Sequence, residues 1–176
     1  MSAENIERRT ATGLQATGRT LTGYVATFGT PAKITDFVEV IRAGAFTRSL
    51  ESGADVLALA DHDASRVLGR TSSGTLALHE DSHGLAFSLT LPDTTTGRDL
   101  AALAARGDLG GMSFAFESRT EEWRGNTREL IDVELHEISV VQAHPAYSGT
   151  SVNLRHREPQ LFFINENAHN WLRTCQ

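Results

Sequence analysis

Short stretches of alternating apolar and polar residues run through most of the chain, and this period of two predicts β-strands. Turns rich in glycine, serine and aspartate separate them, as at residues 72–74 and 81–84. The close spacing of strands between residues 67 and 91 indicates a β-meander. We expect strands at residues 21–28, 37–41, 56–59, 67–71, 75–78, 85–91, 127–133 and 135–143, besides one that follows Gly110.

Two stretches break this alternation and predict helices. The first is a helical turn that begins near Phe46, runs to about Glu51 and stops at Gly53. The second is an alanine-rich segment in which apolar residues recur at helical spacing, with threonines at 94–96 as N-caps and Gly107 as the stop. This longer helix leads the chain to Gly110.

Residues 110–116, with the sequence GGMSFAF, predict a turn that feeds directly into a strand. The strand period places Met112, Phe114 and Phe116 on one face and Ser113 on the other. A small hydroxyl opposite an aromatic wall suits a nucleophile on a rigid element, and it equally suits an ordinary structural serine.

Seven or eight short strands with two helices favour an α+β fold that is mostly β. Helices do not alternate regularly with strands, so we predict one domain that forms a closed or half-closed antiparallel β-barrel. We expect a polar lead at residues 1–19, the domain at 20–154, and an appendage or docking segment at 155–176.

Charge and composition narrow the function classes. The formal net charge of -6 and the lack of a basic run argue against a nucleic-acid-binding protein. Cys175 is the single cysteine, which excludes an internal disulfide and a cysteine-rich zinc site and favours a reducing compartment. The polar start has no signal-like apolar core, and no run reaches the roughly 18 apolar residues of a membrane span. We therefore expect a soluble protein, without cofactor or membrane.

Histidine is the side chain best suited to take a proton from a hydroxyl near neutral pH, and the chain has seven. His62 ends an apolar strand between two aspartates, a position that suits either a site residue or a solvated loop histidine. His79 and His83 straddle a predicted turn and are a weaker alternative, as metal ligands. His136 and His144 flank the last strand and are candidates for an orienting role.

A series of short segments in fixed order resembles the tailed-phage prohead protease family. Their sequences here are GAF at 44–46, DHD at 61–63, LGR at 68–70, GL at 84–85, LPDT at 91–94, GDL at 107–109, MSFAF at 112–116, EISVV at 137–141 and PAY at 145–147. The resemblance covers about residues 20–154, and it implies a fold similar to that of the herpesvirus capsid-maturation proteases.

The resemblance also implies roles for three residues. The histidine before LGR implies His62 as general base, and the serine of MSF implies Ser113 as nucleophile. The acid of EISVV implies Glu137 as the third residue, which would stabilise the charged imidazole. The herpesvirus relatives have a histidine in this role, so His136 and His144 stay open as alternatives; alternation puts His136 and Glu137 on opposite faces.

By resemblance, the protein is a serine endopeptidase in the host cytoplasm, inside the immature prohead. Its substrates are then the scaffold segments of the major capsid protein, with self-processing, and the herpesvirus relatives imply a homodimer. The alternative is a non-catalytic barrel protein inside the capsid that binds scaffold.

Overall fold

The computed structural model describes residues 6–11 and 14–143. The predicted tail at 155–176 and His144 lie outside the described residues. The described strands form two sheets, one of seven strands in the order β1-β10-β11-β5-β4 with β6 and β7 alongside, and one of four strands in the order β2-β3-β9-β8. The seven-stranded sheet carries the candidate site.

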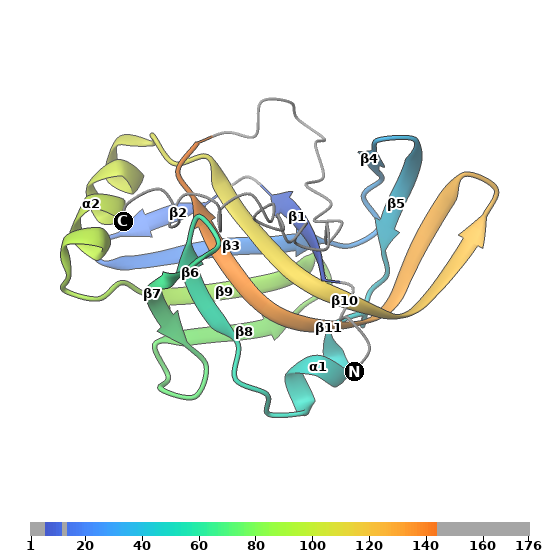
Figure 1. Ribbon diagram of the computed structural model, residues 1–176, viewed down its shortest axis with the longest axis horizontal. Coiled ribbons are helices and arrows are strands. Elements are labelled where there is room, and N and C mark those ends of the chain that lie inside the picture. The colour runs from blue at the N-terminus through green and yellow to red at the C-terminus, as the bar shows by residue number, and fades with distance from the viewer. Residues whose placement is uncertain (1–5, 12–13, 144–176) are drawn as a thin grey trace, which may run out of the picture.

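Two long strands dominate the larger sheet. Strands β10 (Gly111–Arg124) and β11 (Thr127–Val141) pair antiparallel and cross the whole molecule, and their hairpin end projects next to β4 (Ala32–Ile34) and β5 (Phe37–Ile41) (Figure 1). The short strand β1 (Glu7–Ala11) pairs antiparallel with β10 and forms an edge of this sheet. Residues of the predicted polar lead therefore lie directly beside Ser113.

The prediction of a purely antiparallel barrel is wrong. Strand β11 pairs in parallel with β5 through residues 127–130 and with β6 (Leu57–Ala60) through residues 137–140. Between these two parallel regions, β11 forms hydrogen bonds with the segment that joins β5 to β6. The Val133 N–H donates to the Ala45 carbonyl, and the Leu135 N–H donates to Ser49 Oγ. Both sheets stay separate, so the described strands close no barrel.

The smaller sheet is antiparallel. It consists of β2 (Gln15–Thr17), β3 (Thr20–Thr27), β8 (Leu76–Glu80) and β9 (Gly84–Thr90), while β7 (Asp63–Arg70) pairs with β6 in the other sheet. The predicted meander over residues 67–91 is confirmed only for its last two strands, because its first strand does not belong to this sheet. Helix α1 (Thr47–Glu51) packs near β11, and helix α2 (Thr95–Arg106) lies at the end of the molecule opposite the hairpin (Figure 1).

The predicted end signals of α2 are confirmed. The Thr94 side chain accepts a hydrogen bond from the Gly97 N–H at 3.2 Å, and Gly107 takes the left-handed conformation with φ 76° at the C-terminus. The helix thus stops where the chain turns toward Gly110.

The core lies between the two sheets and contains the aromatic face of β10. Phe114 packs between Phe46 and Phe116, with ring centroids 5.7 Å and 5.3 Å away, and all three are buried. The predicted alternation of β10 is confirmed, because Met112 is also buried in this core while Ser113 takes the other face. Burial of large aromatic side chains on one face fixes the register of β10 and therefore the position of Ser113.

Candidate active site

Ser113 lies on the central strand β10, flanked by a partner strand on each side. It is opposite Thr10 of β1 and opposite Ser139 of β11. Side chains of directly opposed residues lie on the same face of a sheet. The face that carries Ser113 therefore also carries Thr10 and Ser139, one from each neighbouring strand.

His62 lies in a tight two-residue turn that joins β6 to β7. Asp61 and His62 have φ of 51° and 61°, and Ala60 pairs with Asp63 across the turn. A two-residue hairpin turn with both residues at positive φ usually contains asparagine and glycine. For other residues this backbone conformation is strained and unfavourable in free energy. Strain of this kind persists only where surrounding contacts hold it.

Those surrounding contacts come from the end of β11. The Asp61 N–H donates to the Val140 carbonyl at 3.0 Å, and the His62 N–H donates to Ser139 Oγ at 3.2 Å. The Asp61 carboxylate accepts from the Gln142 N–H at 2.9 Å. Strand β11 thus fixes the backbone of His62, and Ser139, which sequence reasoning missed, is the side chain that bonds it directly.

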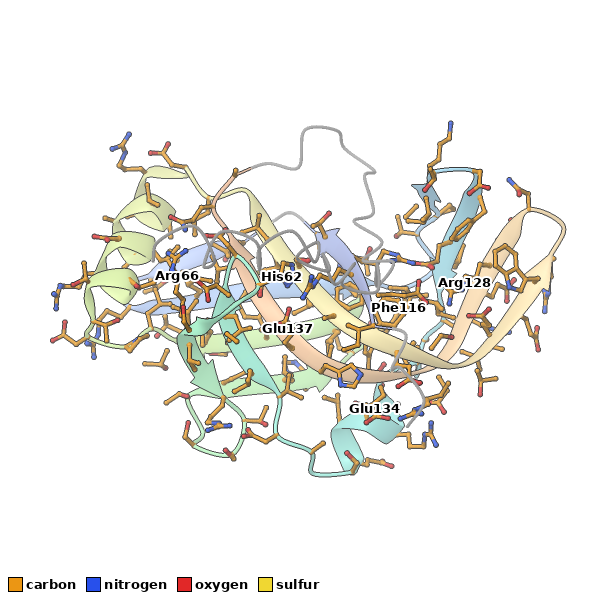
Figure 2. All side chains as sticks on the ribbon, viewed as in Figure 1. His62, Arg66, Phe116, Arg128, Glu134 and Glu137 are labelled. Atoms are coloured by element: carbon orange, nitrogen blue, oxygen red, sulfur yellow. The ribbon has the colours of Figure 1, made fainter. Side chains whose placement is uncertain are left out.

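The three residues predicted from the sequence lie together in one hydrogen-bonded series. His62 Nδ1 contacts Glu137 Oε1, and His62 Nε2 lies 2.8 Å from Ser113 Oγ. Figure 2 shows His62 and Glu137 side by side over the centre of the larger sheet. The series joins a carboxylate, an imidazole and a hydroxyl from β11, the β6–β7 turn and β10.

The hydroxyl of Ser113 has a second acceptor. Ser113 Oγ also lies 2.8 Å from the backbone carbonyl oxygen of Arg9 in β1. A hydroxyl carries one proton, so it donates either to the Arg9 carbonyl or to His62 Nε2 when that nitrogen is unprotonated. The edge strand thus competes with the imidazole for this proton.

Among the described residues of the site, the imidazole and the carboxylate are more exposed than the serine. Ser113 is buried, whereas the side chains of His62 and Glu137 keep 19% and 13% of their exposure. The Gly110 N–H, which precedes the strand, donates to the Val141 carbonyl at 2.8 Å. This N–H is therefore already hydrogen-bonded and is not free to stabilise a reacting oxygen.

A second side chain, that of Arg8, faces the Glu137 carboxylate. Arg8 of β1 is opposite Ala115 of β10, which is itself opposite Glu137 of β11. Arg8 Nε lies 3.7 Å from Glu137 Oε1, the same oxygen that contacts His62. Sequence reasoning missed Arg8, because an arginine in a polar stretch carries no period that marks it.

The opposite face of β1 contributes to a cluster of five charged residues, which we call the ion cluster: the buried Glu7, Arg9, Glu39 and Arg128 and the exposed Glu121. Burial lowers the pKa of Arg128, but hydrogen bonds and charges of its carboxylate partners outweigh burial and raise it. Burial likewise raises the pKa of Glu7, and bonds to Arg128 and Arg9 reverse this to a net lowering. Arg128 is seen toward the hairpin end in Figure 2, away from His62.

The other histidines that the structure describes lie apart from this series. His136 follows Leu135 at an irregularity in the β10–β11 register, and its buried Nε2 makes no hydrogen bond within the described part of the chain. His79 belongs to β8, and the His83 ring packs edge-on against Tyr24 with centroids 4.5 Å apart. Among residues 6–11 and 14–143, no group of three side chains is arranged to hold a metal ion.

A hydroxyl, an imidazole and a carboxylate in series define a site of the serine-hydrolase type. A family model for caudovirus prohead serine proteases matches residues 4–162, and the chain belongs to this family of serine proteases. No curated protein and no solved structure matches the chain. Within the described residues, no helix is long and apolar enough to cross a membrane.

Proposed function

We propose that the protein is a serine endopeptidase of prohead maturation in which Ser113, His62 and Glu137 act as nucleophile, general base and orienting acid. The observation that carries this proposal is the 2.8 Å separation of Ser113 Oγ and His62 Nε2, with Nδ1 of the same ring on Glu137. The family membership gives the reaction class. The geometry supports the assignment of the residues.

The first step is the attack of Ser113 Oγ on a peptide carbonyl carbon. His62 Nε2 takes the hydroxyl proton as the new C–O bond forms, and the imidazolium passes that proton to the leaving amine as the C–N bond breaks. Water then attacks the acyl-enzyme, again with His62 as base, and releases the acid product and the serine.

Glu137 sets the tautomer of the ring. Its contact with Nδ1 keeps a proton on that nitrogen and leaves Nε2 unprotonated toward Ser113. The carboxylate also stabilises the imidazolium that forms in each step. A carboxylate stabilises this cation better than a neutral histidine does, which favours Glu137 over His136 as the third residue.

The substrates we propose are scaffold segments of the major capsid protein, cleaved inside the prohead, together with sites in the chain itself. Coexpression with the capsid protein of the same phage, followed by intact mass measurement, tests this. We expect shortened capsid protein with the native chain and full-length capsid protein with Ser113→Ala. Capsid protein that copurifies uncut with the native chain would instead indicate the non-catalytic scaffold-binding protein.

A further inference from the structure

The guanidinium of Arg8 lies close to the carboxylate of Glu137. Among residues 6–11 and 14–143, the ion pair with Glu137 is the one interaction shown for the Arg8 side chain. Its Nε is buried and makes no hydrogen bond there. A buried N–H without an acceptor is unfavourable. The attraction between the Arg8 and Glu137 charges is therefore the interaction that favours this position of the Arg8 side chain.

The fold brings Arg8 to this place through three strands. Arg8, Ala115 and Glu137 form one row across β1, β10 and β11. Ala115 is the small middle member, so the two long side chains meet above it. The neighbours of Arg8 on β1, Glu7 and Arg9, turn to the other face and join the ion cluster, which leaves Arg8 to Glu137.

Arg8 and His62 therefore share one oxygen, Glu137 Oε1. The Arg8 cation on one side and the His62 Nδ1–H on the other restrain the carboxylate in position. The Arg8 charge also lies beside the imidazole ring, where it opposes a second positive charge. The first effect acts on the base through Glu137, and the second acts on the ring directly.

We propose that Arg8 is a positioning residue, which holds the Glu137 carboxylate against His62 and adds a positive charge beside the imidazole. The inference rests on the proposed function for its kinetic consequence. The effect on the ring is a property of the folded chain and is measurable without turnover.

Other charges near His62 must be separated from Arg8. Asp61 and Arg66 pair with each other at 3.1 Å beside the turn, and Asp63 accepts from Ser65 Oγ at 2.6 Å. Arg66→Gln is therefore the matched control, because it removes one positive charge near His62 without touching Glu137. Figure 2 shows Arg66 on the β7 side of His62, away from Glu137.

The first measurement is an NMR titration of the His62 ring in the full chain, assigned by comparison with His62→Ala. We expect Arg8→Gln to move the titration midpoint up by about half a unit to one unit, because a nearby cation is removed. Arg8→Lys should stay within about 0.2 units of the native midpoint since the charge is kept. Arg66→Gln should shift it less than Arg8→Gln, because solvent screens the half-exposed Arg66.

The second measurement is peptide turnover against pH for the same variants. For Arg8→Gln we expect kcat to fall about 10- to 100-fold, because Glu137 and His62 lose their alignment. KM should stay within about twofold of the native value, and the acid limb of the kcat/KM profile should move to higher pH. Arg8→Lys should recover part of the rate. The fraction of active sites, titrated with a serine-directed probe, and the thermal transition show whether β1 stays in place.

The outcomes separate the proposed role of Arg8 from the proposed protease function. If Arg8→Gln is folded and leaves both the His62 midpoint and the acid limb unchanged, the role of Arg8 is wrong even when the native chain cleaves peptides. A rate loss matched by lost active sites, with unchanged midpoint, makes Arg8 structural only and also overturns the inference. If the midpoint shifts as expected but the native chain shows no turnover, the positioning of His62 stands and the proposed protease function fails.

Discussion

The two faces of β1 place similar charges in different surroundings. On one face, Arg8 lies beside Glu137 and the imidazole of His62. On the other, Glu7 and Arg9 belong to the ion cluster with Arg128, where every cation is an arginine. An arginine stays charged at any physiological pH, whereas a histidine gains or loses a proton near neutral pH. The first face is thus equipped to transfer protons, and the second to hold strands together.

Loss of the nucleophile or the base should have the largest effect. Because the triad residues act as a unit, Ser113→Ala and His62→Ala should each lower peptide turnover about 10⁴-fold or more, and the double variant should be little worse than either. Ser65→Ala, which removes a hydroxyl near the same turn, should keep the native rate. Additive losses in the double variant would contradict the assignment.

Removal of the Glu137 charge should have the next largest effect. Glu137→Gln keeps the shape but loses the stabilisation of imidazolium, so turnover should fall about 10³- to 10⁴-fold and the His62 titration should move to lower pH. His136→Ala and His144→Ala should stay within a few fold. Near-native turnover of Glu137→Gln, with collapse of one histidine variant, would mean a Ser-His-His triad.

The ion cluster should matter for stability. Arg128→Leu removes the partner of two buried carboxylates, Glu7 and Glu39, and of the exposed Glu121, and should lower the free energy of unfolding by about 3–5 kcal/mol. Arg124→Leu, which breaks exposed ion pairs on the same hairpin, should change it by less than about 0.5 kcal/mol. Urea unfolding of both variants measures this. Equal small losses would show that the cluster stabilises little.

Acid should reduce the stabilisation that the ion cluster provides, by less than the loss expected for Arg128→Leu. The pKa of Glu7 is lower in the folded protein than its ordinary value of 4.5, because its bonds to Arg128 and Arg9 outweigh burial. A lowered carboxyl pKa gives stability that is complete above pH 4.5 and is lost as pH falls through the folded-state value. Glu7→Gln should flatten this part of the profile of unfolding free energy against pH. An unchanged slope in this variant would exclude Glu7 as its source.

The candidate site was predictable where a local pattern marks it. The alternation of Met112, Phe114 and Phe116 places Ser113 on the free face of its strand, and His62 follows an apolar strand that ends abruptly. Glu137 came from the family resemblance, because one glutamate among several on β11 has no distinguishing neighbour. The structure brings all three into contact.

Long-range pairing accounts for what the sequence did not show. A period of two is the same for parallel and antiparallel neighbours, so the parallel pairing of β11 with β5 and β6 was unreadable. Strand β1, with the sequence ERRTA, looks solvated, yet Glu7 and Arg9 are buried through partners far along the chain. Arg8 and the Arg9 carbonyl were missed for the same reason, because each contacts the site across more than a hundred residues.

Labelling with a fluorophosphonate probe tests the central claim most directly, since such a probe reacts with a serine that an adjacent base has activated. Intact mass and peptide mapping should show one adduct, at Ser113, in the native chain. Labelling should be absent in Ser113→Ala and strongly slowed in His62→Ala. An adduct at another serine, or labelling that persists in Ser113→Ala, would contradict the assignment of the nucleophile.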